Sequence, residues 1–389
     1  MSIDLPLISV IIPAYNAEAF IAETLHSVLS QTYPNIEILV VDDGSQDSTP
    51  NIVELFAEKN PHIILLRQSN KGVAAARNLA IEKSKGEYIA PIDADDIWFP
   101  EKLEKQMQVM LESDRSLGIV YAWSVYINED STLTKTCQTS YFEGNIYIPL
   151  LYGNCLGNAS SPLIRRSCIN QVGGYSCQLK EQQAQGCEDW DIYLRIAEYY
   201  KVKVVPEVLI GYRQVIGSMS FNAVAMKKSF QLVFTNTQQR YPEIPASIYH
   251  WSSSNFNWYL ALRSYQCGDH WSTIFYIYQA AKLDYLPLLR PSFYKLLVKS
   301  ILKIIAKPIT SLIWPEHRDW LKFKRKFRFF NSVIDIPELN EMYKKNHQKF
   351  PWKHYIVFIS KRCSQIEKQW KPADRKLTLN SVNNRVSSL

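Results

Sequence analysis

Within its first hundred residues the chain alternates between short β-branched runs and amphipathic helical segments. The runs at 8–12, 36–41, 63–66 and 88–92 have the composition of strands buried on both faces, and helical segments lie between them at 17–31, 49–60 and 73–85. Few folds accommodate this order, because each helix must return the chain to a neighbouring, parallel strand. The sequence therefore predicts an α/β fold with a Rossmann-like, mostly parallel sheet flanked by helices.

Polar segments follow three of these strands directly, at residues 14–16, 42–45 and 93–96. Ligands of such sheets bind where the carboxyl ends of the parallel strands meet. We therefore expect the three segments to face one crevice.

The segment 93–96 concentrates negative charge in a chain whose formal net charge is +7. Asp93 and Asp95 lie on the same side of an extended segment, and their carboxylates repel each other unless a cation lies between them. Oxygen ligands of this kind suit Mg²⁺ or Mn²⁺. The alternative is a solvated acidic turn that caps the next helix, a role that we assign to Asp96.

Four further charged residues, at three places in the sequence, each have two interpretations. Asp43, which precedes Gly44 at a strand end, could bind a base or ribose, or could form a turn with the neighbouring backbone. Arg77 could contact a diphosphate or the acidic segment, or lie exposed on its helix. Glu188 and Asp189 begin a helical run, where a carboxylate could act as general base or could simply complement the helix dipole.

Five segments resemble, in order and spacing, those of the family 2 glycosyltransferases with the GT-A fold: SVIIPAYN, VVDDGSQDST, NKGVAAARNLA, GEYIAPIDADD and CEDWDIYLRIA. The resemblance covers roughly residues 7–220. It implies an inverting transfer of a sugar from a nucleotide-diphospho-sugar donor to an acceptor hydroxyl, with Mn²⁺ or Mg²⁺ as cofactor. In such a reaction a carboxylate accepts the proton of the attacking hydroxyl, and the metal neutralises the departing diphosphate.

The resemblance also assigns roles to single residues. It implies contacts to the nucleotide-sugar by Pro13, Tyr15, Asp43, Arg77 and Asp93. It implies metal binding by Asp95 together with Asp93. It implies base catalysis by Asp189, with Glu188 as a second candidate. Many relatives carry a histidine two residues after a Tyr-Arg pair, whereas Tyr212-Arg213 is followed here by Gln214 and Val215. This metal ligand is therefore missing from the sequence, and Arg213 is left as a candidate phosphate contact.

We expect four parts along the chain: a GT-A catalytic domain at 1–225, a helical hairpin region at 226–290, a basic amphipathic helical region at 291–375 and a disordered tail at 376–389. The segments 158–165 and 172–175 resemble acceptor-side segments of the family, and 176–186 is either a mobile rim of the acceptor site or a plain connector. The hairpin should pair helices at 258–267 and 271–283, with Asp269 as an N-cap and the aromatic side chains in the core.

The basic region has the strongest charge pattern. Lys295, Lys299, Lys303 and Lys307 recur every fourth residue in an otherwise aliphatic helix, and eleven basic against two acidic residues lie between 290 and 328. Lysines near its middle exclude a membrane-spanning helix, and Pro308 should end it. We expect residues 293–330 to bind an anionic membrane surface, although the helix could instead pack in protein. Nucleic acid is not an expected partner, because no base-reading motif accompanies the charge.

The first residues resemble an initial strand more than a signal peptide, and seven cysteines without paired spacing suit a reducing compartment. We therefore expect a cytoplasmic enzyme, peripheral on the inner face of the cell membrane, that acts in surface polysaccharide, lipopolysaccharide or other glycan biosynthesis on a glycan or lipid-linked acceptor. The competing hypothesis is a non-catalytic module that keeps the GT-A fold as a scaffold at the membrane.

Overall fold

The alternating N-terminal pattern folds into a parallel half-sheet, as the sequence predicts. In the computed structural model, which describes residues 5–313, 335–347 and 352–369, the first four strands run parallel in the order β3-β2-β1-β4. These strands and the helices between them are β1 (Ile8–Ala14), α1 (Ile21–Leu29), β2 (Ile36–Asp42), α2 (Thr49–Lys59), β3 (Ile63–Arg67), α3 (Val73–Lys83) and β4 (Tyr88–Pro91).

The second half of the sheet mixes strand directions. β8 (Leu163–Arg165) runs antiparallel to β4 and to β6 (Leu117–Ile127), and β6 pairs in parallel with the long strand β9 (Lys201–Arg213). β5 (Ile97–Trp98) and β7 (Leu133–Gln138) pair antiparallel with β9 and β6. The helices of this half are α4 (Lys102–Leu111), α5 (Tyr147–Tyr152), α6 (Arg166–Val172), α7 (Gln178–Glu181) and α8 (Glu188–Ala197). The predicted α/β fold is confirmed.

Both faces of the inner parallel strands are covered, which explains why β1, β2 and β4 are mostly apolar. Ile11 and Leu39 point toward α3 and α8, whereas Val10, Ile12 and Val40 point toward α1 and α4, and none of the five is exposed. Each such side chain stabilises the fold by about 1.5–3 kcal/mol. This core fixes the strand ends that carry the polar segments.

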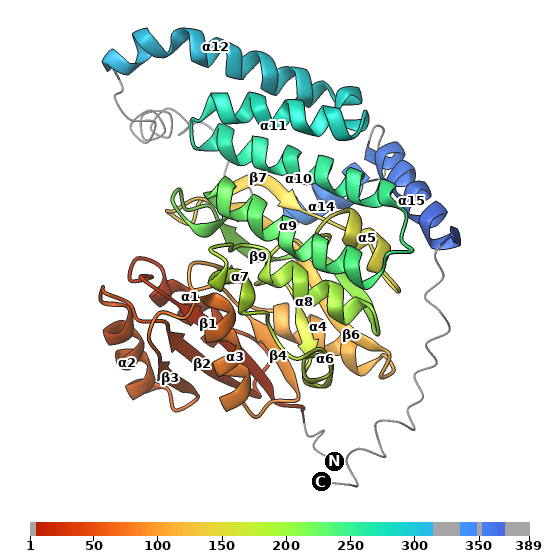
Figure 1. Cartoon of the computed structure of the whole chain (residues 1–389). Coiled ribbons are helices and arrows are strands. Elements are labelled where there is room, and N and C mark those ends of the chain that lie inside the picture. The colour runs from red at the N-terminus through yellow and green to blue at the C-terminus, as the bar shows by residue number, and fades with distance from the viewer. Residues whose placement is uncertain (1–4, 314–334, 348–351, 370–389) are drawn as a thin grey trace.

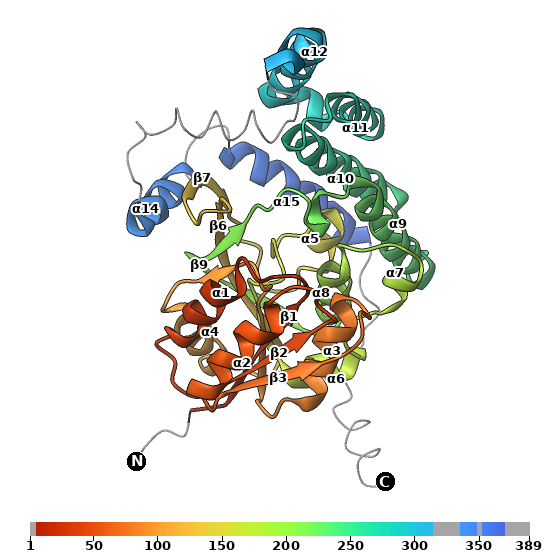
Figure 2. The same ribbon diagram turned by 90° about the vertical axis from the view of Figure 1, so that its left-hand side faces the viewer.

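A stack of long helices follows the sheet. α9 (Ala223–Arg240), α10 (Ala246–Gln266), α11 (His270–Leu283) and α12 (Pro291–Ile313) lie one against the next, away from the sheet, with short turns η1 (Met219–Phe221) and η2 (Leu286–Leu289) beside them (Figures 1 and 2). The predicted hairpin corresponds to α10 and α11. Asp269 caps α11 as expected, since its carboxylate accepts a hydrogen bond from the backbone N–H of Ser272 at 3.0 Å.

Two predictions for this stack were wrong. Pro308 does not end α12, which continues to Ile313, because a proline removes one backbone donor and the other hydrogen bonds of the helix remain. The aromatic residues of the hairpin are not all in the core either: Trp258 is buried, but Trp271 is 71% exposed and Tyr278 61% exposed. The outer face of α11 has no helix packed over these two rings in the parts of the chain that the structure describes.

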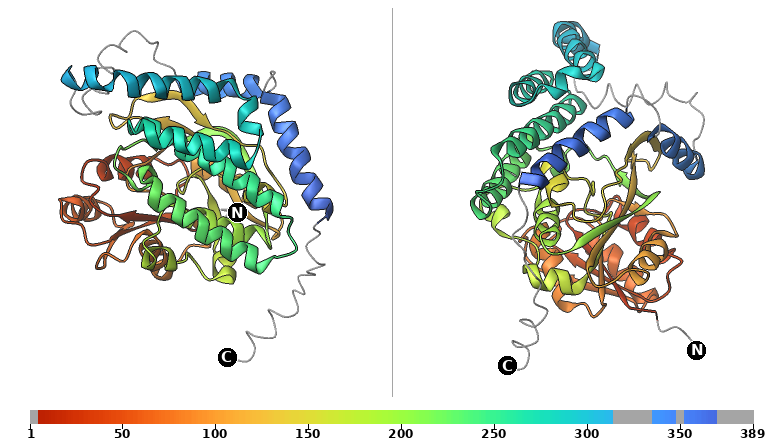
Figure 3. Two further views of the ribbon diagram at one scale, coloured as in Figure 1. Left: turned by 45° about the horizontal axis from the view of Figure 1, so that its top comes forward. Right: turned by 90° about the vertical axis from the view of Figure 1, so that its right-hand side faces the viewer.

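Two C-terminal helices, α14 (Ile336–His347) and α15 (Trp352–Gln369), return to the sheet and pack near β9 and α5 (Figure 3). The hydroxyl of Tyr343 donates a hydrogen bond to the main-chain oxygen of Lys135 at 2.7 Å. The basic run 321–330 and the tail 376–389 lie outside the described residues, and the division of the chain into four parts stays a prediction.

A buried ion pair joins α15 to the end of α11. Arg362 donates to both carboxylate oxygens of Asp284, at 2.6 and 2.9 Å, and both side chains are less than a tenth exposed. We expect Arg362→Ala to lower the free energy of unfolding, measured in urea, by about 3–5 kcal/mol, because it leaves a buried carboxylate unpaired. The double variant Arg362→Met/Asp284→Asn should recover most of this loss, and an equal loss in both proteins would contradict the ion-pair explanation.

Candidate active site

A cavity of about 1140 Å³ opens where the carboxyl ends of the strands meet. Elements far apart in the sequence line it, from β1 to the helix α10. The structure brings all nine predicted site residues to its wall: Pro13, Tyr15, Asp43, Arg77, Asp93, Asp95, Glu188, Asp189 and Arg213. The expected convergence of the segments after β1, β2 and β4 therefore occurs.

The end of the cavity near β1 and β2 combines an exposed ring with a buried carboxylate. Tyr15 follows β1 and is 51% exposed, whereas Asp43 follows β2 and is 4% exposed. The carboxylate of Asp43 accepts hydrogen bonds from the backbone N–H groups of Lys71 and Gly72, at 2.7 and 2.8 Å, and from Gln68 at 2.7 Å. Asp43 thus holds the loop before α3 in place while lining the cavity.

Arg77 of α3 is almost fully buried and pairs with the first carboxylate of the acidic segment. Its guanidinium contacts the Asp93 carboxylate at 2.6 Å, and the ring of Tyr175 lies 5.2 Å from the guanidinium carbon. The Nε–H of Arg77 is buried without a hydrogen-bond partner. A buried donor without an acceptor is costly, so this group is placed to bind an acceptor atom that a ligand would bring.

Asp95 differs from Asp93 and Asp96 in that its carboxylate accepts no hydrogen bond from another described residue. Among the described residues, none other than Asp95 itself donates a hydrogen bond to its carboxylate, which burial and the nearby charge of Asp93 leave with a pKa raised to about 7. Two crowded carboxylates, of which only Asp93 has an ion-pair partner among the described residues, fit a divalent cation. No group of three His, Cys, Asp or Glu side chains within the described ranges is arranged for a metal, so the protein would supply Asp93 and Asp95 and leave other positions to ligand or water.

Asp96 does not begin the following helix, which corrects our assignment. Helix α4 begins at Lys102, and the carboxylate of Asp96 is fully buried, where it accepts hydrogen bonds from the Ser160 hydroxyl and from the backbone N–H of Arg213. Burial raises the pKa of Asp96 well above its usual range. Asp96 therefore fastens β9 to the acidic segment, and of the three carboxylates of this segment Asp93 and Asp95 line the cavity.

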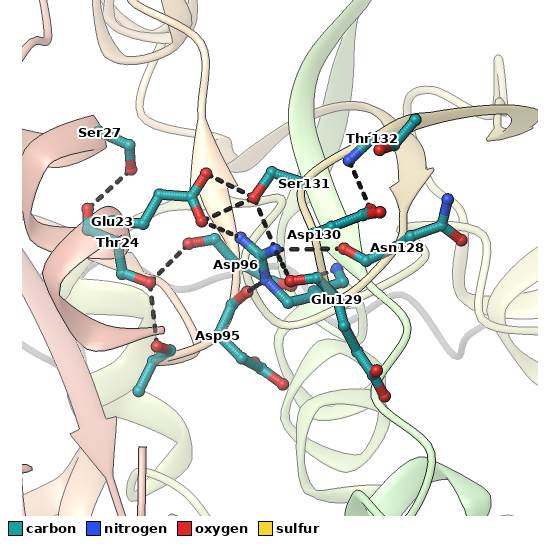
Figure 4. A network of polar contacts seen from close by, with 12 residues as sticks. Glu23, Thr24, Ser27, Asp95, Asp96, Asn128, Glu129, Asp130, Ser131 and Thr132 are labelled. Carbon is teal, nitrogen blue, oxygen red and sulfur yellow. Dashed lines mark hydrogen bonds and ion pairs between the residues drawn. The ribbon is translucent and has the colours of Figure 1, made fainter. Parts of the chain in front are cut away.

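Arg213 is fixed by a network around its guanidinium, and Figure 4 labels its partners Glu23, Asp95 and Ser131. It pairs with Glu23 at 2.6 Å and donates to the main-chain oxygen of Asp95 at 2.6 Å and to Ser131 at 2.8 Å. Figure 4 shows the Asp95 carboxylate pointing away from this network, toward the lower part of the view. Arg213 thus orients Asp95 through its backbone, and most of its donors are already used.

The two carboxylates that begin α8 have different surroundings. Glu188 is buried and accepts a hydrogen bond from the backbone N–H of Gly186 at 2.7 Å, so it shapes the preceding loop. Asp189 is half-buried and accepts from the backbone N–H of Trp190 at 2.8 Å and from the side-chain amide of Asn154 at 3.3 Å. Burial raises the pKa of Asp189 to about 7, although Arg77 and the Trp190 N–H act in the opposite direction.

Several residues at this site were missed by the sequence reasoning. Ser160 accepts a hydrogen bond from the backbone N–H of Asp93 at 2.9 Å, and Asn154 contacts Asp189. From the helical stack, Tyr259 and Arg263 of α10 line the cavity. Ser160 lies in a segment that the sequence had singled out, whereas nothing in the local sequence marks Asn154 or Arg263.

Known proteins that are similar to this chain are glycosyltransferases. Residues 9–171 match the family model "Glycosyl transferase family 2". The chain is 41% identical over 129 residues to the putative teichuronic acid biosynthesis glycosyltransferase TuaG of Bacillus subtilis, which is 33% of this chain and 50% of that protein. It is 39% identical over 214 residues to an uncharacterized glycosyltransferase of Rickettsia typhi, which is 54% of this chain and 64% of that one. The chain thus spans about half to two thirds of these relatives.

Among solved structures, the fold is similar to that of the mannosyltransferase PcManGT from Pyrobaculum calidifontis, which was solved in complex with GDP-Man and Mn²⁺. The TM-score is 0.50 at 19% identity, and the match covers 80% of this chain and 88% of the other. At this identity the likeness concerns the fold alone, and it agrees with the predicted GT-A architecture.

Proposed function

We propose that this chain, whose residues 9–171 match the model of glycosyltransferase family 2, transfers a sugar, with inversion, from a nucleotide-diphospho-sugar to an acceptor hydroxyl. One observation carries the proposal: Asp189 lines the same cavity as Asp93 and Asp95, and Arg77, which pairs with Asp93, also acts electrostatically on Asp189. The candidate base, Asp189, and the candidate leaving-group site at Asp93 and Asp95 therefore lie around the same cavity.

On the acceptor side, Asp189 serves as general base. Its carboxylate accepts the proton of the attacking hydroxyl while the new glycosidic bond forms and the bond to the diphosphate breaks. The backbone N–H of Trp190 and the amide of Asn154 hold this carboxylate in position. A pKa of about 7 makes Asp189 a stronger base than an exposed aspartate and still leaves it largely ionised at slightly alkaline pH.

On the donor side, Arg77, Asp93 and Asp95 receive the diphosphate. Asp93 holds the guanidinium of Arg77 at the cavity wall, where the unpaired Nε–H would donate a hydrogen bond to a phosphate oxygen. Asp93 and Asp95 would hold Mn²⁺ or Mg²⁺, which supplies charge neutralisation of the departing diphosphate when bound. Pro13, Tyr15 and Asp43 lie at the part of the cavity that we assign to the nucleoside.

A panel of nucleotide-sugars tests the activity directly. Purified protein with Mn²⁺ should release nucleoside diphosphate slowly from at least one UDP- or GDP-sugar without an acceptor, because water can replace the acceptor hydroxyl. The alternative, a non-catalytic GT-A scaffold at the membrane, predicts no release from any donor above the rate in protein-free buffer. Binding of a donor without any release would favour the scaffold.

We assign the acceptor to a surface polysaccharide, lipopolysaccharide or related glycan. The relative TuaG is named for teichuronic acid biosynthesis, which supports a cell-surface glycan as the product class. A glycan of this kind is assembled on a lipid carrier or at the cell surface, and such an acceptor suits an enzyme at the inner face of the membrane.

The outer surface of α11 and α12 supports a membrane partner. In the ranges described, no helix combines the length and the apolar character that a membrane crossing requires. The surface is nevertheless apolar: Trp271 and Tyr278 of α11 and Leu302 and Ile305 of α12 are each 59–71% exposed. α12 also carries the exposed Lys295 and Lys299, and a helix with exposed apolar and basic side chains suits the interface of an anionic bilayer.

We expect Lys295→Gln/Lys299→Gln to weaken binding to vesicles that contain anionic lipid by roughly thirtyfold, because each lysine near the surface contributes about 1 kcal/mol. Co-sedimentation with phosphatidylglycerol-containing vesicles measures the change. The control variant Lys59→Gln/Lys83→Gln removes two exposed lysines of α2 and α3 and should bind like the wild type. Equal binding of the wild type to neutral and anionic vesicles would contradict the membrane assignment.

A further inference from the structure

Four arginines of the described chain are buried, and one of them differs from the others. Arg77, Arg213 and Arg362 each form an ion pair with a carboxylate at 2.6 Å. Arg263 of α10 is 3% exposed, and within the described residues it forms no ion pair. Its charge is therefore buried without a counterion from the part of the chain that the structure describes.

The contacts of Arg263 are neutral. Its guanidinium donates to the side-chain oxygens of Gln214 and, at 3.1 Å, of Gln266. The rings of Phe221, Tyr259 and Tyr126 surround it at 4.9, 5.0 and 5.8 Å from the guanidinium carbon to the ring centre. These contacts compensate only part of the cost of burial, since a cation over an aromatic ring gains about 0.5–2 kcal/mol.

An arginine cannot reduce this cost by losing its proton, because its pKa is too high. A lysine can: Lys102, also buried, has a pKa lowered well below its usual range by burial. A buried guanidinium that opens onto a ligand cavity is therefore balanced most simply by a negative charge that arrives with the ligand.

The position of Arg263 in the cavity indicates which class of ligand would bring this negative charge. It lies beside Gln214, the residue that follows Arg213 at the end of β9, and it lines the same cavity as Asp95. The charges of Arg77 and Arg213 are already neutralised by Asp93 and Glu23. Apart from Lys180 at the rim, Arg263 is the lining cation without a carboxylate partner among the described residues.

We propose that Arg263 forms a phosphate-binding subsite of this cavity, provided by the helical stack and not by the sheet. This inference rests on the proposed function, because the ligands of a nucleotide-sugar transferase are its source of phosphate. The planar fork of a guanidinium matches two phosphate oxygens. The phosphate belongs either to the donor diphosphate or to a phosphate-bearing acceptor, and both have the same chemistry.

Two variants test the subsite in the full-length protein. Arg263→Gln removes the cation, and Gln214→Glu leaves the arginine but places a carboxylate on its existing contact. Both should weaken phosphate binding at least about tenfold, the loss expected for a charged hydrogen bond. Gln214→Glu should in addition raise the melting temperature of the ligand-free protein, since it supplies the missing counterion. The exposed Gln231→Glu of α9 adds the same charge elsewhere and should change neither property.

Two titrations by calorimetry identify the source of the phosphate. In the first, UDP or GDP is titrated with Mn²⁺; weaker binding by both variants assigns Arg263 to the donor diphosphate. In the second, inorganic phosphate is titrated onto protein saturated with the nucleoside diphosphate that binds more tightly. Weaker binding in this arm alone assigns Arg263 to the acceptor phosphate.

Affinities equal to the wild type in both arms for both variants would overturn the subsite. A purely structural Arg263 predicts this result together with a stabilised Gln214→Glu protein. The outcome is separate from the fate of the proposed function. Protein that turns over no nucleotide-sugar but binds phosphate through Arg263 would refute only the transferase, and active protein with unchanged affinities would refute only the subsite.

Discussion

Asp189→Asn should lower kcat for sugar transfer by about 10²–10⁴-fold, the usual contribution of a general base, while the dissociation constant of the donor stays within about twofold. The amide keeps the shape of the side chain and can still accept a hydrogen bond from the Trp190 N–H, so the start of α8 is preserved. It cannot accept the proton of the acceptor hydroxyl. Initial rates with a matched donor and acceptor, and calorimetry with the donor alone, separate the two effects.

The pH profile gives a second measurement of the same group. Because burial raises the pKa of Asp189 to about 7, kcat/KM of the wild type should fall as the pH decreases through about 7, where the base becomes protonated. The residual activity of Asp189→Asn should lack this fall. Asp191→Asn is a matched control, since Asp191 lies two residues further along α8 and pairs with Arg195 outside the cavity. A transfer rate in Asp189→Asn close to that of the wild type would remove Asp189 as the base.

The N-terminal half of the fold was predictable because its determinants are local. A run such as residues 8–12 has no polar face, so it must be covered on both sides, and the helices that follow it in the sequence provide the cover. Strand direction then places Asp43 and Asp93 at the same edge, without any knowledge of long-range contacts. This reasoning, together with the family resemblance that assigned roles to residues such as Asp189 and Arg213, brought nine candidate residues to one cavity.

The errors arose where a distant contact outweighs a local preference. Asp96 has the sequence context of a helix cap, but its carboxylate accepts a hydrogen bond from the backbone of Arg213, a residue 117 positions away. Arg263 belongs to an ordinary helical sequence, and only the packing of η1 and α10 around its side chain makes it a buried cation. Trp271 is a large aromatic residue of the kind usually found in a core, yet α12 packs on another face of α11 and leaves Trp271 exposed.

For the acidic segment 93–96, the sequence and the structure each supply a different part of the explanation. Crowding of carboxylates indicated a cation, and the structure adds that Asp93 is shared with Arg77 whereas Asp95 has no donor from another described residue. The contact between the guanidinium of Arg213 and the main-chain oxygen of Asp95 could not be predicted, because the two residues lie 118 positions apart. Of the carboxylates of this segment, Asp95 is thus the one whose removal should weaken metal binding most and lower the stability of the fold least.

Asp95→Asn should abolish the effect of Mn²⁺ on donor binding. We expect the wild type to bind UDP or GDP at least about tenfold more tightly with Mn²⁺ than with EDTA, a difference of about 1.4 kcal/mol, and the variant to bind equally in both conditions. An amide oxygen is a weaker ligand than a carboxylate, and Asp93 alone is already engaged by Arg77. Calorimetric titrations of the same nucleoside diphosphate in the two buffers give the four dissociation constants.

The metal-free protein provides an independent readout of the same substitution. Asp95→Asn removes one of two adjacent like charges without removing a hydrogen bond from another described residue, so the EDTA-treated variant should melt at the same temperature as the wild type or above it. Asp114→Asn, an exposed aspartate in the turn after α4, should retain the full Mn²⁺ effect. A loss of Mn²⁺ response together with a lower melting temperature would mean that Asp95 supports the fold of the cavity, whereas an unchanged Mn²⁺ response would exclude it as a ligand.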